Sequence, residues 1–302
     1  METPLIVGGR EIRTRGRLVR VARIEGDSYR FLDDPEAIIS DLRNSEQSID
    51  LFTFIPRLTD TTPKFAYPLE IDNVAALRVT TFDQWWTQVL GFKGRNKAKQ
   101  AEKKGVELRE VPFDDQLIDG IWQIYNECPI RQSRRFPHYG MTRETVREHA
   151  GTFLDCSIFI GAYFEGSLIG FAKLTIDETG TQAGLMHILS LISHRAKAPT
   201  NALIAEAVRS CAARNISYLV YSSFAYGNKQ RDSLSDFKER NGFQRVDLPR
   251  YFVPLTRFGA LAFRMRMHRR MIELLPEPLI TRLRNYRADW YNARVPSAMQ
   301  GN

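Results

Sequence analysis

Hydrophobic and polar residues follow strand and helix periods most clearly between Ser157 and Phe243. Two β-rich runs, SIFIGAYF and SLIGFAKLTI, meet at Glu165-Gly166-Ser167, which predicts a tight hairpin. The later segments are an apolar run from Gln182 to Ile192, a helical stripe from Thr200 to Arg214, a strand from Ser217 to Phe224 and a helix that closes in FKERNGF. This order predicts a sheet with helices packed on it.

Similar patterns occur outside this stretch. The expected strands are Arg17–Glu25, Ile49–Ile55, Val74–Thr80, Val106–Val111 and Tyr251–Leu255, and the expected helices are 34–43, 81–104 with an interruption at 91–94, 114–127, and 144–154 behind a Thr142 cap. Pro56–Pro68 is typical of a loop. The segment Arg95–Lys104 is strongly basic, which fits either a binding surface or a solvated helix face.

Composition adds bounds on size and location. A length of 302 residues suggests about two domains, and 43% hydrophobic with 26% charged residues is ordinary for a globular protein. No apolar run reaches the ~18 residues of a membrane-spanning helix, and the N-terminus lacks a signal-peptide pattern. Cys128, Cys156 and Cys211 have no metal-ligand spacing and favour buried thiols in a reducing compartment. We expect a cytoplasmic protein without a metal.

The chain carries a net charge of +8, and much of it lies in the tail. From Arg257 to the end there are nine Arg and three acidic residues, nine minus three or +6. One helical face is predicted to hold Phe258, Leu261, Ala262, Met265, Ile272 and Leu275, and a second helix is expected from Leu279 to Tyr291 after Pro276 and Pro278. Such a tail either binds an anionic membrane, placing the protein at the inner membrane face, or packs on the protein.

The order of elements from Gly105 to about Thr256 resembles the GNAT acyltransferase superfamily. The helix ending in Lys103 to Val106, the FKERNG run and the large preceding part resemble its two-lobed FemAB-like relatives. The resemblance implies a two-lobed α/β (α+β) fold with a mixed, mostly antiparallel central sheet flanked by helices. It divides the chain into an N-terminal lobe over 1–104, a GNAT-like lobe over 105–256 and a basic helical tail over 257–302.

In GNAT enzymes the donor is an acyl-CoA, such as acetyl-CoA, and its pantetheine pairs with the strand that ends here at Leu189 and Leu191. Its pyrophosphate sits on the following loop, which corresponds to Arg195, Ala196, Lys197, Ala198 and Thr200. Ala198 replaces a glycine of the family pattern, and Pro199 lacks an N–H, so part of the backbone phosphate cradle is missing. Asn228 matches an Asn that contacts the cofactor in many members. FemAB-type enzymes use aminoacyl-tRNA and do not need this loop.

Two residues are candidates for proton transfer. His187 lies on the strand that borders the cleft in this fold, and an imidazole near neutral pKa suits deprotonating an amine. It is expected to share one face with Leu185, Leu189 and Leu191, so a hydrogen-bonded core histidine is the alternative. Tyr226 follows the strand at Ser217–Phe224 and is the candidate general acid, with ordinary packing as its alternative.

The segment PIRQSRRFPHYG, Pro129 to Gly140, corresponds to the loop that lines the acceptor pocket in these families. Its candidate acceptor-binding side chains are Arg131, Arg134, Arg135, His138 and Tyr139. Guanidinium groups bind carboxylate or phosphate in a bidentate fashion, which predicts an anionic acceptor. A solvated loop is the alternative.

The sequence therefore predicts an N-acyltransferase that moves an acetyl or other acyl group from acyl-CoA to an amine of a small-molecule, glycan or peptide acceptor that is anionic or sugar-containing. Two alternatives remain. One is a FemAB-type peptidyl transferase that uses aminoacyl-tRNA. The other is a non-catalytic binding protein on a GNAT scaffold, because fold alone does not decide function.

Overall fold

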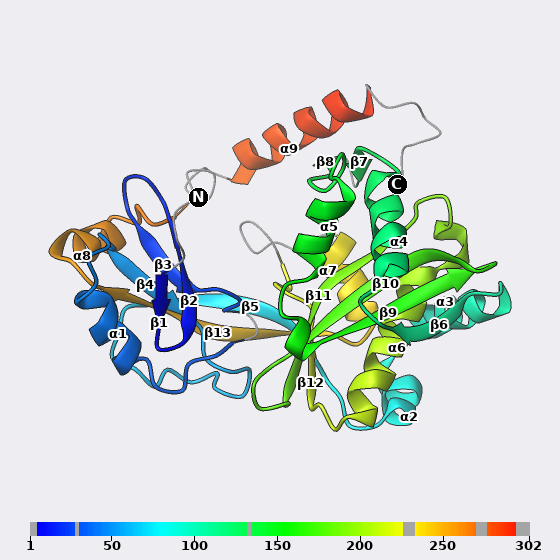
Figure 1. Cartoon of the computed structure of the whole chain (residues 1–302), viewed down its shortest axis with the longest axis horizontal. Helices are drawn as coiled ribbons and strands as arrows, with labels where there is room; N and C mark the ends of the chain where they lie inside the picture. Colours follow the sequence, from blue (N-terminus) through cyan, green and yellow to red (C-terminus); the bar gives the residue numbers. More distant parts are fainter. Residues whose placement is uncertain (1–4, 28–29, 132–133, 226–232, 270–276, 294–302) are drawn as a thin grey trace.

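The computed structural model describes residues 5–27, 30–131, 134–225, 233–269 and 277–293 (Figure 1). Within these ranges, eleven strands form one sheet in the order β1-β2-β3-β4-β13-β5-β12-β11-β10-β9-β6. The strands are β1 (Leu5–Val7), β2 (Arg10–Arg15), β3 (Val21–Ile24), β4 (Leu51–Phe54), β5 (Leu69–Arg78), β6 (Glu107–Val111), β9 (Ser157–Phe164), β10 (Ser167–Ile176), β11 (Gln182–Ser190), β12 (Tyr218–Val220) and β13 (Gln244–Pro254). The short β7 (Ile130–Arg131) and β8 (Arg134–Arg135) pair with each other.

The helices are α1 (Glu36–Arg43), α2 (Phe82–Gln84), α3 (Phe92–Lys103), α4 (Asp115–Asn126), α5 (Arg143–Ala150), α6 (Pro199–Ala213), α7 (Ser233–Arg240), α8 (Arg257–Arg264) and α9 (Glu277–Asn292). A π-helical turn, Trp85–Val89, follows α2, and this turn and Gly91 account for the predicted interruption before α3. The Thr142 hydroxyl accepts a hydrogen bond from Thr145 N at 3.3 Å, so the predicted cap of α5 is confirmed.

The predicted hairpin is confirmed by its turn geometry. Phe164 and Ser167 are register partners, and the two residues between them, Glu165 and Gly166, have φ angles of 50° and 78°. Positive φ at both central positions is the type I′ arrangement, whose twist matches that of the flanking strands. The hairpin places β10 between β9 and β11 in the middle of the GNAT-like half.

Each face of this half of the sheet has its own hydrophobic core. On one face, α6 buries Leu203, Ile204 and Val208 against the strands together with alanines of α3. On the opposite face, α4 buries Ile121 and Ile124 against Phe159, Phe171 and the inner side of α5. A separate core lies beside α1, where Phe52, Phe54 and Tyr251 pack together.

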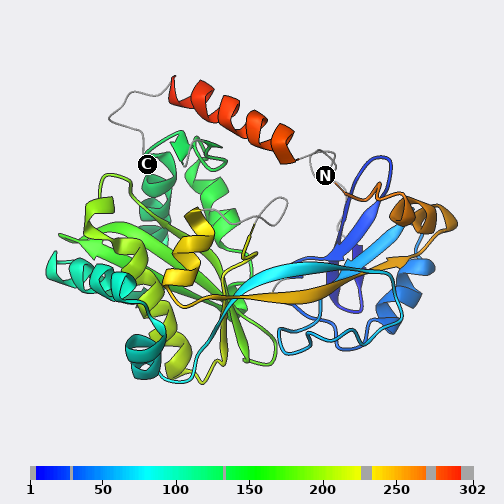
Figure 2. The ribbon, with the colours of Figure 1, turned by 180° about the vertical axis from the view of Figure 1, so that it is seen from behind.

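Two long strands connect the halves of the molecule (Figure 2). The register of β5 with β13 extends from Ala76↔Gln244 to Leu69↔Tyr251, and β13 continues along β4 to Pro254. Because one strand belongs to both halves, the sheet is continuous. The bounds 1–104 and 105–256 for the two lobes stay a prediction.

The tail differs from its prediction. The helix α8 ends at Arg264, and Arg266 has a φ of 57°, so a single helical face from Phe258 to Leu275 is wrong. The chain turns because Phe263 and His268 stack at 4.8 Å and both pack on Phe252. Ile272 and Leu275 lie outside the described residues. In the described part of the chain, no helix has both the length and the apolar character needed to cross a membrane.

Candidate functional site

The strands β11 and β12 diverge at the position where the GNAT resemblance places the donor. Their parallel pairing covers only Gln182↔Tyr218 to Gly184↔Val220, whereas β11 continues to Ser190. Beyond Val220 the chain follows β5 instead, with Tyr221 N donating to Ala75 O at 2.8 Å. Within the described residues, the second half of β11 is therefore paired on one edge only, which leaves backbone groups for a ligand.

Two charged side chains, Glu127 and Arg131, bind the end of β11. Of these, only Arg131 was a candidate site residue from the sequence. The Glu127 carboxylate accepts hydrogen bonds from Ile192 N at 2.6 Å, Ser193 N at 2.9 Å and the Ser193 hydroxyl at 2.8 Å. Arg131 donates to Ser190 O at 2.7 Å and to Ile124 O at 2.6 Å, and it pairs with Glu127 at 3.2 Å. These contacts use backbone groups next to Leu189 and Leu191, where pantetheine was predicted to pair.

The predicted pyrophosphate loop also uses much of its own backbone. The amides of Arg195, Lys197 and Ala198 donate to the carbonyls of Ile192, His194 and Arg195, at 2.9–3.0 Å. Ala198 has a φ of 55° and is buried, so its side chain occupies space that a glycine would leave open. The Thr200 hydroxyl lies 3.1 Å from the Ser190 hydroxyl. Few amides remain for a phosphate group.

The basic helix α3 is attached to this loop. Lys104 Nζ donates to Ala196 O at 2.8 Å, and Gln100 Nε2 donates to the same oxygen at 3.2 Å. Lys197 Nζ lies 4.1 Å from the centre of the Phe164 ring, while the Arg195 side chain is exposed. The lysines of α3 and the cations of the loop therefore form one surface beside the end of β11.

His187 lies on the β11 face that packs against α4 and α5, next to Phe171 and His138. A β-bulge at Met186 changes the alternation of side chains, because Lys173 opposes His187 while Leu174 opposes Leu185. Leu185 consequently packs in the core on the opposite face, so the prediction that it shares a face with His187 is wrong. No described residue forms a hydrogen bond with the His187 ring, which differs from the core-histidine alternative.

Three imidazoles meet near this bulge. The ring centre of His138 lies 6.3 Å from that of His187 and 6.1 Å from that of His149 on α5, and Tyr125 stacks on His138 at 4.6 Å. Three buried polar atoms nearby lack a hydrogen-bond partner among the described residues: Tyr125 Oη, His138 Nδ1 and Arg131 Nε. Buried polar groups are usually paired, so a group of unpaired ones suggests a place for a polar ligand.

Lys173 is a residue that the sequence analysis missed. It is 0% exposed, and its ammonium donates to Ala150 O at 2.8 Å, to Thr152 O and to the Thr152 hydroxyl at 3.3 Å. It thereby holds the C-terminal end of α5, where a cation is favoured by the helix dipole. Its signal in the sequence was a single charge inside the apolar run SLIGFAKLTI.

Burial lowers the pKa of three members of this cluster, and neighbouring positive charge adds to the effect at the two imidazoles. Burial, followed by the positive charge of Lys173 and the neighbouring imidazoles, lowers the pKa of His187 to about 4. Burial and His149 also lower the pKa of His138, and burial lowers the pKa of Lys173 to about 8. At neutral pH both imidazoles are therefore uncharged and able to accept a proton or a hydrogen bond.

The other predicted acceptor residues are separated from this cluster or lie at its edge. Arg134, Arg135 and Tyr139 are exposed on β8 and the following turn, with α9 passing close to β8 (Figure 1). Arg131 points inward and is neutralised by Glu127. Only His138 joins His187. The predicted Tyr226 and Asn228 lie outside the described residues.

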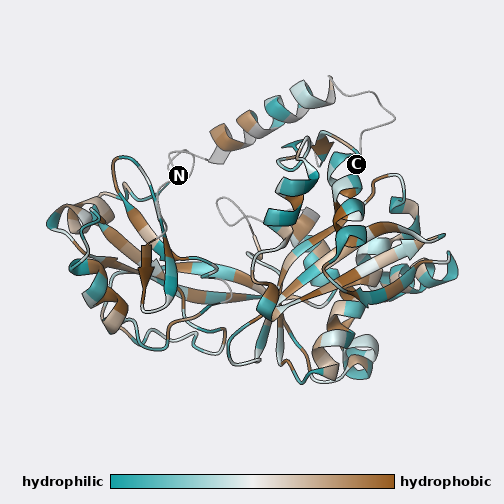
Figure 3. Cartoon of the chain, viewed as in Figure 1, coloured by the Kyte–Doolittle hydropathy of each residue, from teal (hydrophilic) through white to brown (hydrophobic). Residues whose placement is uncertain are grey.

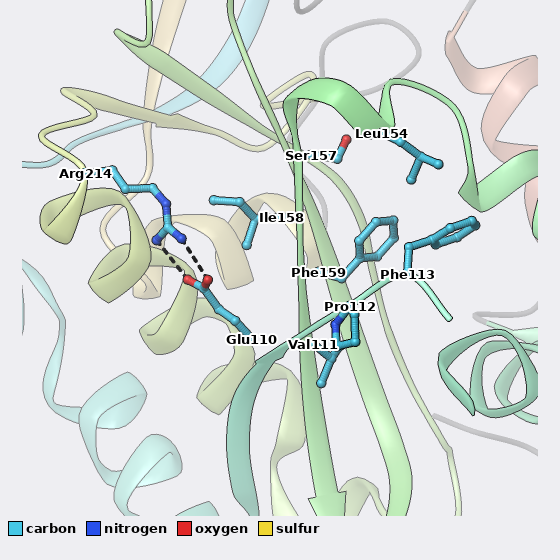
Figure 4. A pocket seen from close by; sticks show the side chains of 9 residues that line it. All are labelled: Glu110, Val111, Pro112, Phe113, Leu154, Ser157, Ile158, Phe159 and Arg214. Carbon is cyan, nitrogen blue, oxygen red and sulfur yellow. Dashed lines mark hydrogen bonds and ion pairs between the residues drawn. The ribbon is translucent and has the colours of Figure 1, made fainter. Parts of the chain in front are cut away.

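A hollow of about 420 Å³ lies elsewhere, at the edge of the sheet between β6 and β9 (Figure 4). Its polar groups are Glu110 and Arg214, which form a bidentate ion pair with N–O distances of 2.8 and 2.9 Å, and Phe113 and Phe159 stack on its other side. Because its charges satisfy each other and no unpaired polar atom faces it, we place the candidate site at the three imidazoles instead. Among the described residues, no group of His, Cys, Asp or Glu side chains is arranged to hold a metal ion.

No protein-family model matches this sequence, and no curated protein matches it. Solved structures do resemble it. The C-terminal domain (DUF2156) of a putative lysylphosphatidylglycerol synthetase from Agrobacterium fabrum aligns with a TM-score of 0.55 and 14% identity over 86% of each chain. L-PGS from Bacillus licheniformis aligns with a TM-score of 0.55 and 14% identity, over 88% of this chain and 89% of that one. FemX aligns with a TM-score of 0.53 and 9% identity, over 80% of this chain and 83% of that one.

The chain has a two-lobed GNAT-like fold of the FemAB kind. This confirms the fold class expected from the order of elements. The strand β11, the loop after it and the helix α6 follow one another in the order that the sequence predicted. At such low identity the resemblance concerns the fold, and the chemistry has to be argued from the residues of this chain.

The depressed pKa of His187 predicts a loss of stability in acid. The unfolded imidazole binds a proton below about pH 6.5, whereas the folded one resists it until about pH 4, so stability falls as the pH drops through this window. The His187 imidazole is therefore expected to lower the free energy of unfolding at pH 5 by about 2 kcal/mol relative to pH 7. Urea unfolding at both pH values is expected to show that His187→Gln loses about 2 kcal/mol less than the wild-type protein on acidification. Equal losses would contradict the burial of a neutral imidazole.

Proposed function

We propose that this protein is an acyltransferase that takes an activated aminoacyl group from the ester of a tRNA-like carrier and passes it to an acceptor amine or hydroxyl. One observation carries the choice of donor. The backbone groups of Ser190, Ile192 and Ser193, next to the residues predicted to pair with the pantetheine of coenzyme A, are bound by Glu127 and Arg131. A donor carried by a polynucleotide does not need those groups.

The surface of α3 supports a polyanionic carrier. Its four lysines, Lys93, Lys97, Lys99 and Lys103, and Lys104 directly after it are exposed, and among the described residues none of them forms an ion pair with a carboxylate. Some exposed arginines elsewhere do have such a partner, as Arg147 has Asp115 and Arg245 has Asp247. Unneutralised cations release counterions from a nucleic acid on binding.

An aromatic side chain accompanies these cations. Phe92, at the start of α3, is 75% exposed. An exposed ring beside lysines is the combination that binds single-stranded nucleic acid ends, through base stacking together with phosphate contacts. Through Lys104 and Gln100 this surface reaches Ala196, next to the end of β11. A carrier bound on α3 would therefore reach the loop after β11, and its end would have to pass this end of the sheet to reach His187 on the opposite face.

The names of two kinds of protein with a similar fold support an aminoacyl donor. The Agrobacterium protein is named for the synthesis of lysylphosphatidylglycerol, a product that joins lysine to phosphatidylglycerol. The resemblance to FemAB-type enzymes likewise implies an aminoacyl-tRNA donor. Both belong to the same reaction type, in which an aminoacyl ester is attacked by an acceptor.

The reaction requires little beyond placement and one base. The acceptor nitrogen or oxygen attacks the ester carbonyl carbon, the C–O bond to the carrier ribose breaks, and the proton of the acceptor is returned to the leaving ribose oxygen. His187 is uncharged at neutral pH and presents a ring without a hydrogen-bond partner among the described residues. It is therefore the candidate proton acceptor, and His138 and Tyr125 are candidates for holding the acceptor.

An acyl-CoA donor is the second candidate, and it is the one that the sequence favoured. Arg195 is exposed at the loop before α6, and the N-terminus of α6 attracts phosphate. The two donors can be separated with purified protein. Labelled aminoacyl-tRNA and labelled acetyl-CoA are each mixed with anionic lipids and with amines, and the labelled products are counted. Transfer from acetyl-CoA alone, with a thermal shift on adding coenzyme A, would overturn the proposed donor.

The contribution of α3 is testable by charge reversal. The double change Lys93→Glu and Lys97→Glu is expected to raise KM for the aminoacyl-tRNA about 10-fold and to weaken its dependence on salt. The matched control is Arg17→Glu with Arg43→Glu, which makes the same change in net charge at exposed residues of the first lobe. If both variants change KM to the same extent, the effect is one of net charge and α3 is not the binding surface.

A further inference from the structure

The end of the chain exposes apolar side chains in an ordered pattern. On α8, Phe258 is 41% exposed, Leu261 50% and Met265, directly after the helix, 63%. Their spacing of three and four residues places them on one side of the helix. The other side holds the helix to the protein, because Gly259 and Ala262 are buried against Asp50 and Leu51. The exposed side therefore has no partner within the described residues.

The helix α9 repeats this pattern. Leu279, Leu283, Tyr286 and Trp290 are 43%, 48%, 73% and 41% exposed. Their spacing of four, three and four residues forms one stripe along the helix, while Ile280 is buried at 2% on a different side. In Figure 3 the first turns of α9 carry the apolar colour, and its later turns are polar or intermediate in hydropathy. Single exposed apolar residues are common on proteins, but aligned sets on two successive helices of the chain are not.

Cations without partners accompany both stripes. Arg257, Arg264 and Arg266 are exposed around α8, and Arg282 and Arg287 are exposed on either side of the α9 stripe. None of these five forms an ion pair with a carboxylate in the described part of the chain. Among the described side chains of α9, the acidic one is Asp289, which is exposed on the same side as Arg282. An apolar stripe bordered by arginines matches a surface that has acyl chains below anionic headgroups.

We propose that α8 and α9 form a docking surface for an anionic lipid bilayer, with the stripes inserted at the headgroup boundary and the arginines bound to lipid phosphates. The name "tail surface" is used below for Phe258, Leu261, Met265, Leu279, Leu283, Tyr286 and Trp290 with these five arginines. The inference concerns the acceptor side of the reaction and does not depend on the identity of the donor. A protein held in this way takes its acceptor from the bilayer or from a molecule anchored in it.

Membrane binding of the full-length protein is measured at low salt by sedimentation with vesicles of phosphatidylcholine that contain about 30% phosphatidylglycerol. Two variants remove the stripes separately. One carries Phe258→Ser, Leu261→Ser and Met265→Ser, and the other carries Leu283→Ser, Tyr286→Ser and Trp290→Ser. Each is expected to weaken binding about 10-fold or more. The control, Ile6→Ser with Leu18→Ser, removes apolar residues that are 69% and 71% exposed in the first lobe, and it is expected to bind as the wild-type protein does.

Fluorescence adds a second measurement at a single residue. The Trp290 emission is expected to move to shorter wavelength with anionic vesicles and to be quenched by brominated lipid, and the signal is assigned by its loss in Trp290→Phe. Three results would overturn the proposal: unchanged binding of both stripe variants, equal binding to pure phosphatidylcholine vesicles, or concentration-dependent dimerisation that the same variants abolish. In the last case the stripes are an interface between copies of the chain.

Discussion

Replacing Asp177 with alanine is expected to lower the free energy of unfolding by about 3–5 kcal/mol. The side chain of Asp177 is 1% exposed and accepts hydrogen bonds from Thr181 N and Gln182 N, each at 2.8 Å, and from the Arg57 guanidinium. Its removal leaves two backbone donors without their acceptor, and it leaves the largely buried Arg57 guanidinium with Asp33 as its remaining carboxylate partner. Urea unfolding at pH 7 measures the loss.

The next residue along the chain gives the control. Glu178 is 49% exposed and pairs with Arg10 at the surface, so Glu178→Ala is expected to cost less than about 1 kcal/mol. Both carboxylates contact arginines of the first lobe, and they differ mainly in burial. Similar small losses of stability in the two variants would show that the ion pair of Arg57 with Asp177 does not hold the segment after β4 to the turn between β10 and β11.

The second large effect concerns the reaction. His187→Ala is expected to lower kcat for aminoacyl transfer by about 100-fold or more, because the base that accepts the proton of the acceptor is removed. KM for the carrier is expected to change little, since the lysines of α3 are untouched. Initial rates at saturating donor measure the effect, and urea unfolding at pH 7 checks that the variant remains folded.

A structural role for His187 would be separated from a catalytic one by added imidazole. If the imidazole ring accepts the proton, free imidazole at millimolar concentration is expected to restore part of the rate of His187→Ala and none of the rate of a variant in the α3 surface. A variant with the wild-type rate, or one whose loss imidazole never relieves, would remove His187 from the reaction.

Much of the fold followed from local patterns. The hairpin required only Glu165-Gly166 between two alternating runs, and the turn residues themselves have the positive φ angles that this turn type needs. The helix α5 followed from one threonine cap. The strand β13 was underestimated, as Tyr251–Leu255 instead of Gln244–Pro254, because its first half is too polar to show a strand period and is defined by pairing with β5.

The site was less predictable because it depends on contacts between distant segments. His187 and His138 were named from the sequence, but the bulge at Met186 decides which face His187 occupies, and no local pattern shows it. Glu127 looked like the end of a helix, yet its carboxylate binds amides some 65 residues later in the chain. Lys173 was hidden within an apolar strand. Each of these positions is defined by tertiary pairing.

The shared strand β13 has a consequence for synthesis of the protein. Strands β4 and β5 are made early, but the strand between them begins at Gln244, after most of the chain has been translated. Until then the two early strands have unpaired inner edges, and the core around Phe52 and Phe54 lacks Tyr251. The N-terminal lobe is therefore the first part to leave the ribosome and among the last to be completed. In the meantime it exposes sheet edges that other chains can join.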